Sequence, residues 1–374
     1  MTNDERFMDR ALSLALKGRG HVSPNPLVGA LVVKAGKIIG EGYHKKAGRP
    51  HAEITALNQA GKQAKGATLY ITLEPCSSFG RTPPCTGAII KSRVKRAVIA
   101  VKDKNPLNKG RGINLLKRNG IEVKTGVLKE KAEKINQPFF KFITKHLPFV
   151  TVKIAQTIDG KIATVCGSSK WITGPAARAY SHRLRSQVDA ILVGIDTVLK
   201  DDPLLTALSP PHPVKIIVDS KLRLPLDAKL LSKKSPAQTI VVVTRQTAKS
   251  KIKVLRRKNV KVIVIRSKFK MVDLRSLMKK LAGLNITHVL IEGGGRVIAS
   301  ALEAGLADRF LVFVAPKIIG GKNALTSVEG IGIRNIKRAI KLKGIEIKRF
   351  GDDILVEGYP VYNTKKRQKK VNEL

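Results

Sequence analysis

The chain has 374 residues, of which 43% are hydrophobic and 26% charged. This length predicts two domains, each with enough apolar residues for an ordinary core, and the composition excludes a globally disordered chain. Three cysteines cannot form the disulfide framework of a small secreted protein, and no apolar run approaches the length that spans a bilayer. Residues 1–20 mix acids and bases without an apolar core, so we expect no secretory signal and a cytoplasmic protein.

The net charge is +44, from 71 Lys and Arg against 27 Asp and Glu. Such a balance attracts polyanions and phosphorylated metabolites. Lysine is nevertheless spread along the whole sequence, and the one compact basic cluster lies in 365–370. A focused nucleic-acid site concentrates its charge on one element, so we expect a solvated basic surface and no specific nucleic-acid binding.

The first half alternates between two periodicities. The pattern predicts helices over 4–17, 51–64 and 86–91, and strands over 28–33, 37–42, 68–73 and 97–101. The order α-β-β-α-β-α-β indicates a mixed sheet flanked by helices. Phenylalanines then crowd the segment 136–148, which Pro148 closes, and there we place a domain boundary that gives a first domain over 1–146.

The second half, 147–362, predicts an open α/β sheet. Strands are expected over 150–155, 190–193, 216–219, 240–244, 260–265, 288–291 and 309–314, and helices over 175–186, 274–281 and 296–304. The last residues, 363–374, are predicted to be a disordered basic tail.

One set of residues predicts a zinc site. His51 and Glu53 begin an expected helix, and Cys76 and Cys85 follow an expected strand. One histidine and two thiolates leave the fourth tetrahedral position to water, as in catalytic zinc sites, where zinc lowers the pKa of that water. Glu53 is then expected to move protons between the water, the ring nitrogen and the departing ammonia, as in zinc deaminases.

The spacing of the cysteines departs from the general deaminase signature, because eight residues separate Cys76 from Cys85 instead of two. The alternative is a surface histidine and two unrelated buried cysteines. The order His-x-Glu, strand, Glu74-Pro75-Cys76 and a second cysteine is hard to obtain by chance, and it favours the metal site.

A second pattern indicates a nicotinamide nucleotide. The strand 288–291 leads into Glu292-Gly293-Gly294-Gly295 and then a helix. Glycines at such a turn let the backbone approach a phosphate at the helix N-terminus, and Arg296 could favour the 2′-phosphate of NADP. Alone the pattern is weak, because a glycine run after a strand is more often an ordinary turn.

The chain resembles the bifunctional deaminase/reductase family of riboflavin biosynthesis from about residue 4 to 359. The matching stretches are Pro24-Asn25-Pro26-Leu27-Val28-Gly29, His51-Ala52-Glu53, Pro75-Cys76-Ser77, Gly80-Arg81-Thr82-Pro83-Pro84-Cys85, Lys153-Ile154-Ala155, Asp159-Gly160-Lys161, Ser169-Lys170-Trp171-Ile172-Thr173 and Thr197–Pro203. The resemblance implies a cytidine-deaminase-like domain followed by a dihydrofolate-reductase-like α/β domain. It implies deamination of 2,5-diamino-6-ribosylamino-4(3H)-pyrimidinone 5′-phosphate, then reduction of the ribosyl group to a ribityl chain by NADPH.

By the same resemblance, the zinc ligands are His51, Cys76 and Cys85, and Glu53 is the proton donor. The residues that contact substrate are expected to be Asn25, His44, Arg81, Ser169, Arg185, Leu205 and Glu292. Those that contact NADPH are expected to be Ala155, Trp171, Thr197, Asp201, Gly293, Gly294, Gly295 and Arg296. We also expect a homo-oligomer.

Two positions depart from the family. Ser78 stands where a histidine is usual, and Ala207-Leu208 stand where a cation is usual after Thr206. Simpler roles also exist for some residues: Trp171 as a core residue, Arg185 as a surface cation, and 201–203 as a helix stop. The rival functions are a zinc deaminase that acts on nucleic acid, disfavoured by 4% aromatics and the second domain, and a basic nucleic-acid-binding protein without catalysis.

Overall fold

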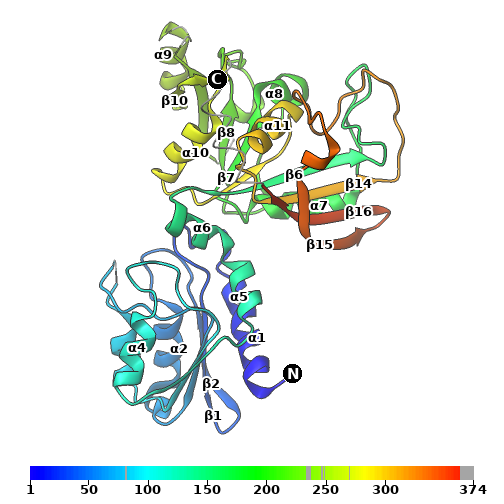
Figure 1. Ribbon diagram of the computed structural model, residues 1–374. Coiled ribbons are helices and arrows are strands. Elements are labelled where there is room, and N and C mark those ends of the chain that lie inside the picture. The colour runs from blue at the N-terminus through cyan, green and yellow to red at the C-terminus, as the bar shows by residue number, and fades with distance from the viewer. Residues whose placement is uncertain (81, 233–236, 246, 248, 269, 363–374) are drawn as a thin grey trace. The chain divides into compact units, whose positions relative to one another are not determined.

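The computed structural model describes residues 1–374 except 81, 233–236, 246, 248, 269 and 363–374. The chain divides into two compact units, one of Met1–Pro148 with Leu284–Thr287 and one of Phe149–Gly283 with the chain from His288 onward. Each unit has its own central sheet (Figure 1). The predicted tail 363–374 lies outside the described residues.

The first unit is a mixed sheet with helices around it. Its elements are α1 (Asn3–Leu16), β1 (Gly29–Lys34), β2 (Lys37–Tyr43), α2 (Ala52–Ala60), η1 (Gly61–Ala64), β3 (Thr68–Ile71), α3 (Cys85–Lys91), β4 (Arg96–Ile99), α4 (Arg111–Arg118), β5 (Glu122–Thr125), α5 (Lys129–Ile135) and α6 (Gln137–Lys145). The sheet order is β2-β1-β3-β4-β5. Strand β1 is antiparallel to β2 and β3, whereas β3, β4 and β5 are parallel. The predicted mixed sheet is thus confirmed, although α4, β5, α5 and α6 are additional to the prediction.

Helix α2 packs on β2 so closely that no side chain fits between their backbones at two positions. A Cβ atom at Gly40 would lie 2.2 Å from the carbonyl oxygen of Ala56, and one at Gly42 would lie 2.5 Å from that of Ala52. Any side chain at these two positions would therefore push the helix off the sheet. The two glycines fix where α2 begins, and His51 is its N-cap residue.

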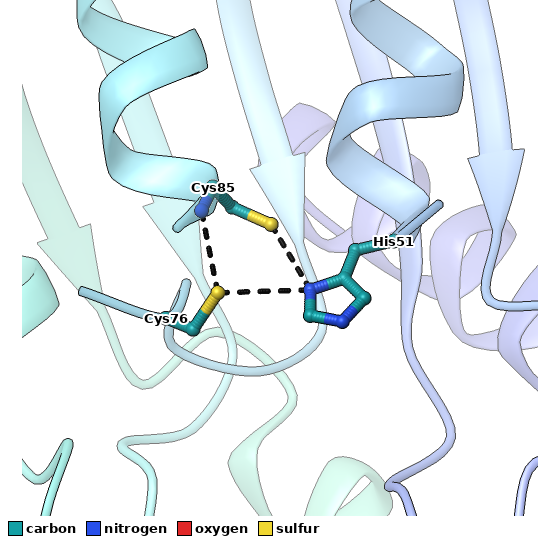
Figure 2. A group of neighbouring side chains, drawn as sticks. All are labelled: His51, Cys76 and Cys85. Atoms are coloured by element: carbon teal, nitrogen blue, oxygen red, sulfur yellow. Dashed lines mark hydrogen bonds between the residues drawn. The ribbon is translucent and has the colours of Figure 1, made fainter. Parts of the chain in front are cut away.

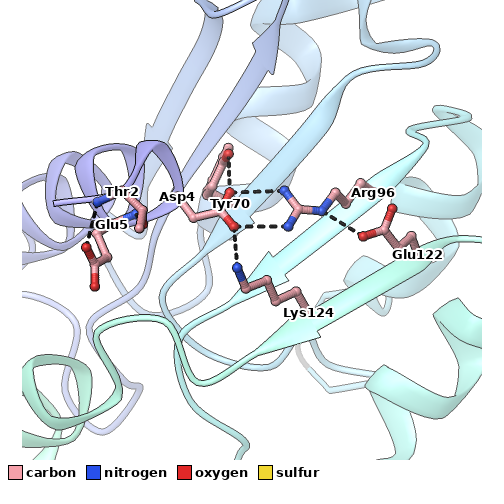
Figure 3. A network of polar contacts seen from close by, with 7 residues as sticks. All are labelled: Thr2, Asp4, Glu5, Tyr70, Arg96, Glu122 and Lys124. Carbon is pink, nitrogen blue, oxygen red and sulfur yellow. Dashed lines mark hydrogen bonds and ion pairs between the residues drawn. The ribbon is translucent and has the colours of Figure 1, made fainter.

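The carboxylate of Asp4 joins the first turn of α1 to the sheet (Figure 3). It accepts hydrogen bonds from the Tyr70 hydroxyl at 2.8 Å, from both terminal nitrogens of Arg96 at 3.0 Å, and from the Lys124 ammonium at 2.8 Å. These three donors stand on β3, β4 and β5. The Arg96 guanidinium is the main reason why the pKa of the Asp4 carboxyl lies well below its usual range.

The second unit is a nine-stranded α/β sheet. Its strands are β6 (Phe149–Thr157), β7 (Ala190–Gly194), β8 (Val214–Val218), β9 (Thr239–Thr244), β10 (Lys261–Ile265), β13 (His288–Ile291), β14 (Arg309–Ala315), β15 (Lys341–Phe350) and β16 (Asp353–Val361), with a separate pair β11 (Ser267–Lys268) and β12 (Met271–Val272). Its helices are α7 (Pro175–Arg185), α8 (Ile195–Asp201), α9 (Lys249–Arg257), α10 (Leu274–Ala282) and α11 (Gly295–Glu303), with short turns η2 (Lys229–Leu231) and η3 (Ile336–Arg338).

The sheet order is β10-β9-β8-β7-β13-β6-β14-β16-β15. The strands from β10 to β14 are parallel, and β16 and β15 close one edge as an antiparallel hairpin. All the predicted strands and helices of this half are present. The hairpin β15–β16, the short pair β11–β12 and the helices α8 and α9 are additional to the prediction.

Candidate active sites

In the first unit, His51, Cys76 and Cys85 converge on one point (Figure 2). Their ligand atoms all lie within 4.8 Å of one another. The Nδ1 atom of His51 lies 3.1 Å from the Cys85 sulfur and 3.6 Å from the Cys76 sulfur. The structure therefore brings the three predicted ligands together, with Nδ1 as the histidine atom that faces both sulfurs.

Three different elements carry these side chains. His51 has extended backbone dihedrals directly before α2, Cys76 lies in the loop after β3, and Cys85 is the first residue of α3. Cys85 also donates its backbone N–H to the Cys76 sulfur at 3.2 Å. The other ring nitrogen of His51 lies 3.4 Å from the Thr82 hydroxyl, which fixes the orientation of the ring.

The surroundings of Cys76 favour a thiolate. A hydrogen bond from the Cys85 thiol is the main cause that lowers the pKa of the Cys76 thiol, and His51 adds to it against the opposing effect of burial. The contact with Cys76 in turn raises the pKa of His51. A thiolate is the form in which cysteine binds a metal.

Glu53 lies in the first turn of α2 and is 3% exposed. Its Oε2 atom is buried and has no hydrogen-bond partner among the described residues. Burial raises the pKa of the carboxyl group, which favours its protonated form. An unpartnered buried carboxyl oxygen is costly, and it indicates a site that is completed by something other than the protein.

Two of the predicted substrate residues lie beside the cluster. The ring of His44 packs edge-on against that of His51, with centroids 5.2 Å apart. Asn25 Nδ2 lies 3.0 Å from His44 Nε2, and His44 Nδ1 lies 3.3 Å from the carbonyl oxygen of Pro50. Burial lowers the pKa of His44, and its contacts suit a neutral ring. The predicted contact of Arg81 falls outside the described residues.

The second unit contains a cavity of about 760 Å³ at the C-terminal ends of β6, β7 and β13. Ligands of open α/β sheets bind at this edge, and the volume is that of a small-molecule site. Every residue predicted to contact NADPH or substrate in this half lines the cavity: Ala155, Ser169, Trp171, Arg185, Thr197, Asp201, Leu205, Glu292, Gly293, Gly294, Gly295 and Arg296.

A buried ion pair stands in the cavity wall. Arg185 Nη2 donates to Glu292 Oε2 at 2.7 Å, and the side chains are 17% and 5% exposed. Arg185 is therefore not one more surface cation, and that alternative is wrong. Lys153 lines the cavity beside this pair, and burial lowers the pKa of its amine while Glu292 opposes that shift. The sequence pattern predicts no role for Lys153; its signals are a lysine inside an apolar strand and its place in the matching stretch 153–155.

Trp171 is 64% exposed and lines the cavity, so the alternative that it is a core residue is wrong. The guanidinium of Arg178 lies over the indole ring at 4.6 Å from its centroid. Lys317 donates to the carbonyl oxygen of Trp171 at 2.7 Å. The contacts of Arg178 and Lys317 with Trp171 could not be predicted from the sequence, because contacts between separate segments leave no local sequence pattern.

The glycine run makes the turn between β13 and α11. Gly293 and Gly294 have φ of +113° and +81°, which only glycine adopts readily. The N-terminus of α11 begins at the cavity wall, and Arg296 there forms an ion pair with Glu329 at 3.4 Å. The segment 201–203 is both a helix stop, because α8 ends at Asp201, and part of the cavity wall.

Family models match both units. Residues 1–101 match the zinc-binding region of cytidine and deoxycytidylate deaminases, and residues 148–356 match the C-terminal domain of RibD. The chain is 48% identical over 356 residues to the riboflavin biosynthesis protein RibD of Aquifex aeolicus, covering 94% of this chain and 97% of that one. It is 38% identical to RibD of Escherichia coli over 94% and 98% of the two chains. Among the helices of the described residues, none is both long and apolar enough to cross a membrane.

Two solved structures are similar over almost the whole chain. RibD of Acinetobacter baumannii has a TM-score of 0.86 at 37% identity, and it covers 96% of this chain. A deaminase/reductase from Thermotoga maritima has a TM-score of 0.83 at 37% identity, over 96% of this chain and 99% of its own. The second domain argues against a deaminase that acts on nucleic acid and against a nucleic-acid-binding protein, because neither function requires a reductase domain. The chain belongs to the RibD family, and it is a bifunctional enzyme of riboflavin biosynthesis with a zinc-binding deaminase domain followed by a reductase domain.

Proposed function

We propose that the chain catalyses two successive steps on one phosphorylated pyrimidine. The first is hydrolytic deamination of 2,5-diamino-6-ribosylamino-4(3H)-pyrimidinone 5′-phosphate, and the second is reduction of the ribosyl group of its product by NADPH. The similar Thermotoga maritima protein is a diaminohydroxyphosphoribosylaminopyrimidine deaminase and 5-amino-6-(5-phosphoribosylamino)uracil reductase. The observation that carries the proposal is the cluster of His51, Cys76 and Cys85 beside the unpartnered carboxyl oxygen of Glu53.

The cluster suits zinc. One imidazole nitrogen and two sulfurs are ligands that zinc prefers, and three protein ligands leave a position open for chemistry. The contact between the two cysteines lowers the pKa of the Cys76 thiol, which favours a thiolate there, and raises the pKa of the Cys85 thiol. When bound, zinc supplies a water nucleophile of lowered pKa at neutral pH.

Glu53 then moves the protons of the first step. Its carboxylate takes a proton from the attacking water and delivers it to the ring nitrogen next to the reacting carbon. A second transfer moves the remaining proton of the new hydroxyl group to the leaving amino group, so that the hydroxyl becomes a carbonyl group and the amine leaves as ammonia. The burial that raises the pKa of Glu53 makes it easier to protonate between these transfers. We assign Asn25 and His44 to substrate contact, because the two form one hydrogen-bonded pair next to His51.

The cavity of the second unit suits a nicotinamide nucleotide and its substrate. It combines glycines and a helix N-terminus, which suit a phosphate, with the ion pair of Arg185 and Glu292. NADPH supplies the hydride to the sugar carbon that bears nitrogen. As that carbon is reduced, the bond to the ring oxygen breaks and the oxygen takes a proton. Lys153 is our candidate donor, since it lines the cavity beside the ion pair and its lowered pKa eases release of the proton.

The variant Glu53→Gln tests the assignment. With the diaminopyrimidine substrate, release of ammonia should fall by at least a hundredfold, because a positioned acid–base group contributes about 10²–10⁴. Reduction of the deaminated intermediate, followed by nicotinamide absorbance, should keep the wild-type rate, and Glu41→Gln provides a surface control. Ammonia release from Glu53→Gln at the wild-type rate would refute the mechanism.

We further propose that residues 1–146 form the deaminase and 147–362 the reductase, and that the enzyme works in the cytoplasm. A reducing compartment suits a site that needs the free thiols of Cys76 and Cys85. Separate expression of 1–146 and 147–362 tests the division, since each part should retain its own reaction. Loss of both reactions in both parts would contradict it.

We also propose a homo-oligomer formed through the outer face of the hairpin β15–β16. Leu342, Ile345 and Ile347 on this face are 36%, 50% and 67% exposed. The register places Ile347 opposite Val356, which is half-buried, and Val356 opposite Val312 of β14. The other face is covered, because Tyr180 of α7 packs on Phe313 and Phe350 there. An exposed apolar strip of this kind marks an interaction site, and a two-fold axis would pair it with its own copy.

Sedimentation velocity at micromolar concentration tests this surface. The wild type should sediment as an oligomer and Ile347→Glu as a smaller species. Val264→Glu places the same charge on β10, at the opposite edge of the sheet, where Val264 is 43% exposed, and it should leave the oligomer intact. A monomeric wild type would refute the proposal.

A further inference from the structure

The side chain of Asn108 lies between the two peptide groups that flank Cys76. Its Oδ1 accepts hydrogen bonds from the backbone N–H of Ser77 at 2.9 Å and from the Ser77 hydroxyl at 3.0 Å. Its Nδ2 donates to the carbonyl oxygen of Pro75 at 3.4 Å and to Asp103 Oδ2 at 3.1 Å. Asn108 is 3% exposed, so water does not compete for these contacts.

Cys76 needs such contacts because it lies in a loop rather than in a strand or a helix. Strand β3 ends at Ile71 and α3 begins at Cys85, so the backbone at Cys76 lies outside the regular ladders of both elements. The carbonyl oxygen of Cys76 accepts a hydrogen bond from the Thr86 N–H at 3.2 Å. Asn108 holds the peptide group before Cys76 and the peptide group after it.

The segment that carries Asn108 is itself held in place. The carboxylate of Glu74 accepts hydrogen bonds from the backbone N–H groups of Asp103 at 3.0 Å, Gly110 at 3.0 Å and Ile113 at 3.2 Å. A Cβ atom at Gly112 would lie only 2.1 Å from the carbonyl oxygen of Pro75, so the start of α4 packs directly on the loop. Asn108 therefore acts from a fixed support.

We propose that Asn108 is a positioning residue of the zinc site, which sets the place of the Cys76 sulfur relative to His51 and Cys85. An amide is suited to this task because it accepts from one peptide group and donates to the other at the same time. Asp103 takes the second N–H of the amide and so fixes which way the group points. The inference rests on the proposed zinc site, and it assigns a role to a residue that does not touch metal or substrate.

The test measures zinc affinity by competition with a chelating indicator. Asn108→Ala removes all four contacts, and Asn108→Asp keeps the shape but loses both donated bonds and places a carboxylate next to Asp103. Both variants should bind zinc about 10- to 100-fold more weakly than the wild type, as is usual when a residue supporting a ligand is removed. Ser77→Ala loses the hydroxyl contact but keeps the backbone contact, so its affinity should stay within about threefold of wild type.

Asn119→Ala is the matched control. Asn119 is an exposed asparagine at the end of α4 whose side chain donates to the carbonyl oxygen of Leu115 at 2.8 Å. It should change neither zinc affinity nor the reductase rate. Cobalt in place of zinc adds a spectroscopic measurement: the visible bands of tetrahedral cobalt should weaken in Asn108→Asp and stay unchanged in Asn119→Ala.

The outcomes separate this inference from the proposed function. If both Asn108 variants bind zinc and cobalt as the wild type does, and only the melting temperature of the metal-free protein falls, Asn108 is a structural residue and the inference is overturned. If Asn108→Ala does not fold, Asn108→Asp decides by the same criterion. If the wild type itself binds no zinc, the zinc mechanism fails and this inference fails with it.

Discussion

The buried ion pair of Arg185 and Glu292 makes a quantitative prediction for Glu292→Gln. Glutamine keeps the size of the side chain and one acceptor oxygen, but it removes the charge that faces the guanidinium. Arg185 keeps a contact with the carbonyl oxygen of Thr206 at 3.1 Å. Removing one partner of a buried pair lowers the free energy of unfolding by about 3–5 kcal/mol. In Glu292→Gln the guanidinium keeps the glutamine oxygen and the Thr206 carbonyl oxygen as acceptors, so we expect a loss of about 3 kcal/mol.

A second ion pair of the same unit provides the control. Arg223 and Asp196 also meet at 2.7 Å, but their side chains are 47% and 57% exposed. Solvent screens this pair, so Asp196→Asn should lower the free energy of unfolding by no more than about 1 kcal/mol. The two pairs meet at the same distance but differ in burial and in the number of hydrogen bonds, because Arg185 donates from Nε as well as Nη2 whereas Arg223 donates once.

Fluorescence of Trp171 during urea unfolding is the assay. The chain has one tryptophan, and it lies in the second unit, so the signal reports that unit alone. Equal shifts of the urea midpoint in Glu292→Gln and Asp196→Asn would refute the reasoning. Glu292→Gln should also lose reduction of the deaminated intermediate while ammonia release persists, because the charge of Glu292 opposes the fall in the pKa of Lys153.

Three further predictions concern the metal, the first unit and the cofactor. A chelator should abolish ammonia release and leave reduction unchanged, and an equal loss of both rates would contradict separate sites. Asp4→Asn should lower the free energy of unfolding at pH 7 by about 2 kcal/mol, because it weakens charge-assisted bonds to Arg96 and Lys124. The folded pKa of Asp4 lies below the unfolded value near 3.8, so this contribution is present above that pH and is lost as the pH falls through the folded pKa. Unfolding of both proteins followed by circular dichroism at several pH values would detect this loss. A difference in the free energy of unfolding between wild type and Asp4→Asn that persisted in strong acid would contradict the prediction. NADPH should quench the fluorescence of Trp171, because this residue lines the cavity. Arg178→Ala should weaken NADPH binding, since the guanidinium lies over the indole ring. Unchanged fluorescence of the wild type on addition of NADPH would argue against the cavity as the cofactor site.

Strongly periodic segments could be predicted from the sequence. The strands β7, β9 and β13 bury nearly all of their residues, and the helix α1 buries its apolar residues at helical spacing, so their patterns are clear. The strands β5 and β15 escape prediction because nearly all of their residues are exposed and no alternation marks a buried face. The cluster of phenylalanines in 136–148 indicates a boundary in the sequence, but residues 137–145 form the helix α6.

The zinc cluster could be predicted because its residue types and their order carry the chemistry. The roles of Lys153, Arg178 and Asn108 could not, because each depends on contacts with segments distant in sequence. A single lysine, arginine or asparagine has no pattern of its own. Only the fold shows that Lys153 stands in a cavity and that Asn108 reaches both sides of Cys76.

The loop between the two cysteines is fixed near its ends. Asn108 holds it at Cys76, and α3 holds it at Cys85, whereas Ser78 is half-buried and Phe79 is 81% exposed. Substitutions at Ser78 and Phe79 can therefore change this loop without displacing the sulfurs of Cys76 and Cys85, whereas Thr82 contacts the ring of His51. Such a loop can change the residues that it exposes, such as Phe79, while the arrangement of the two sulfurs is kept.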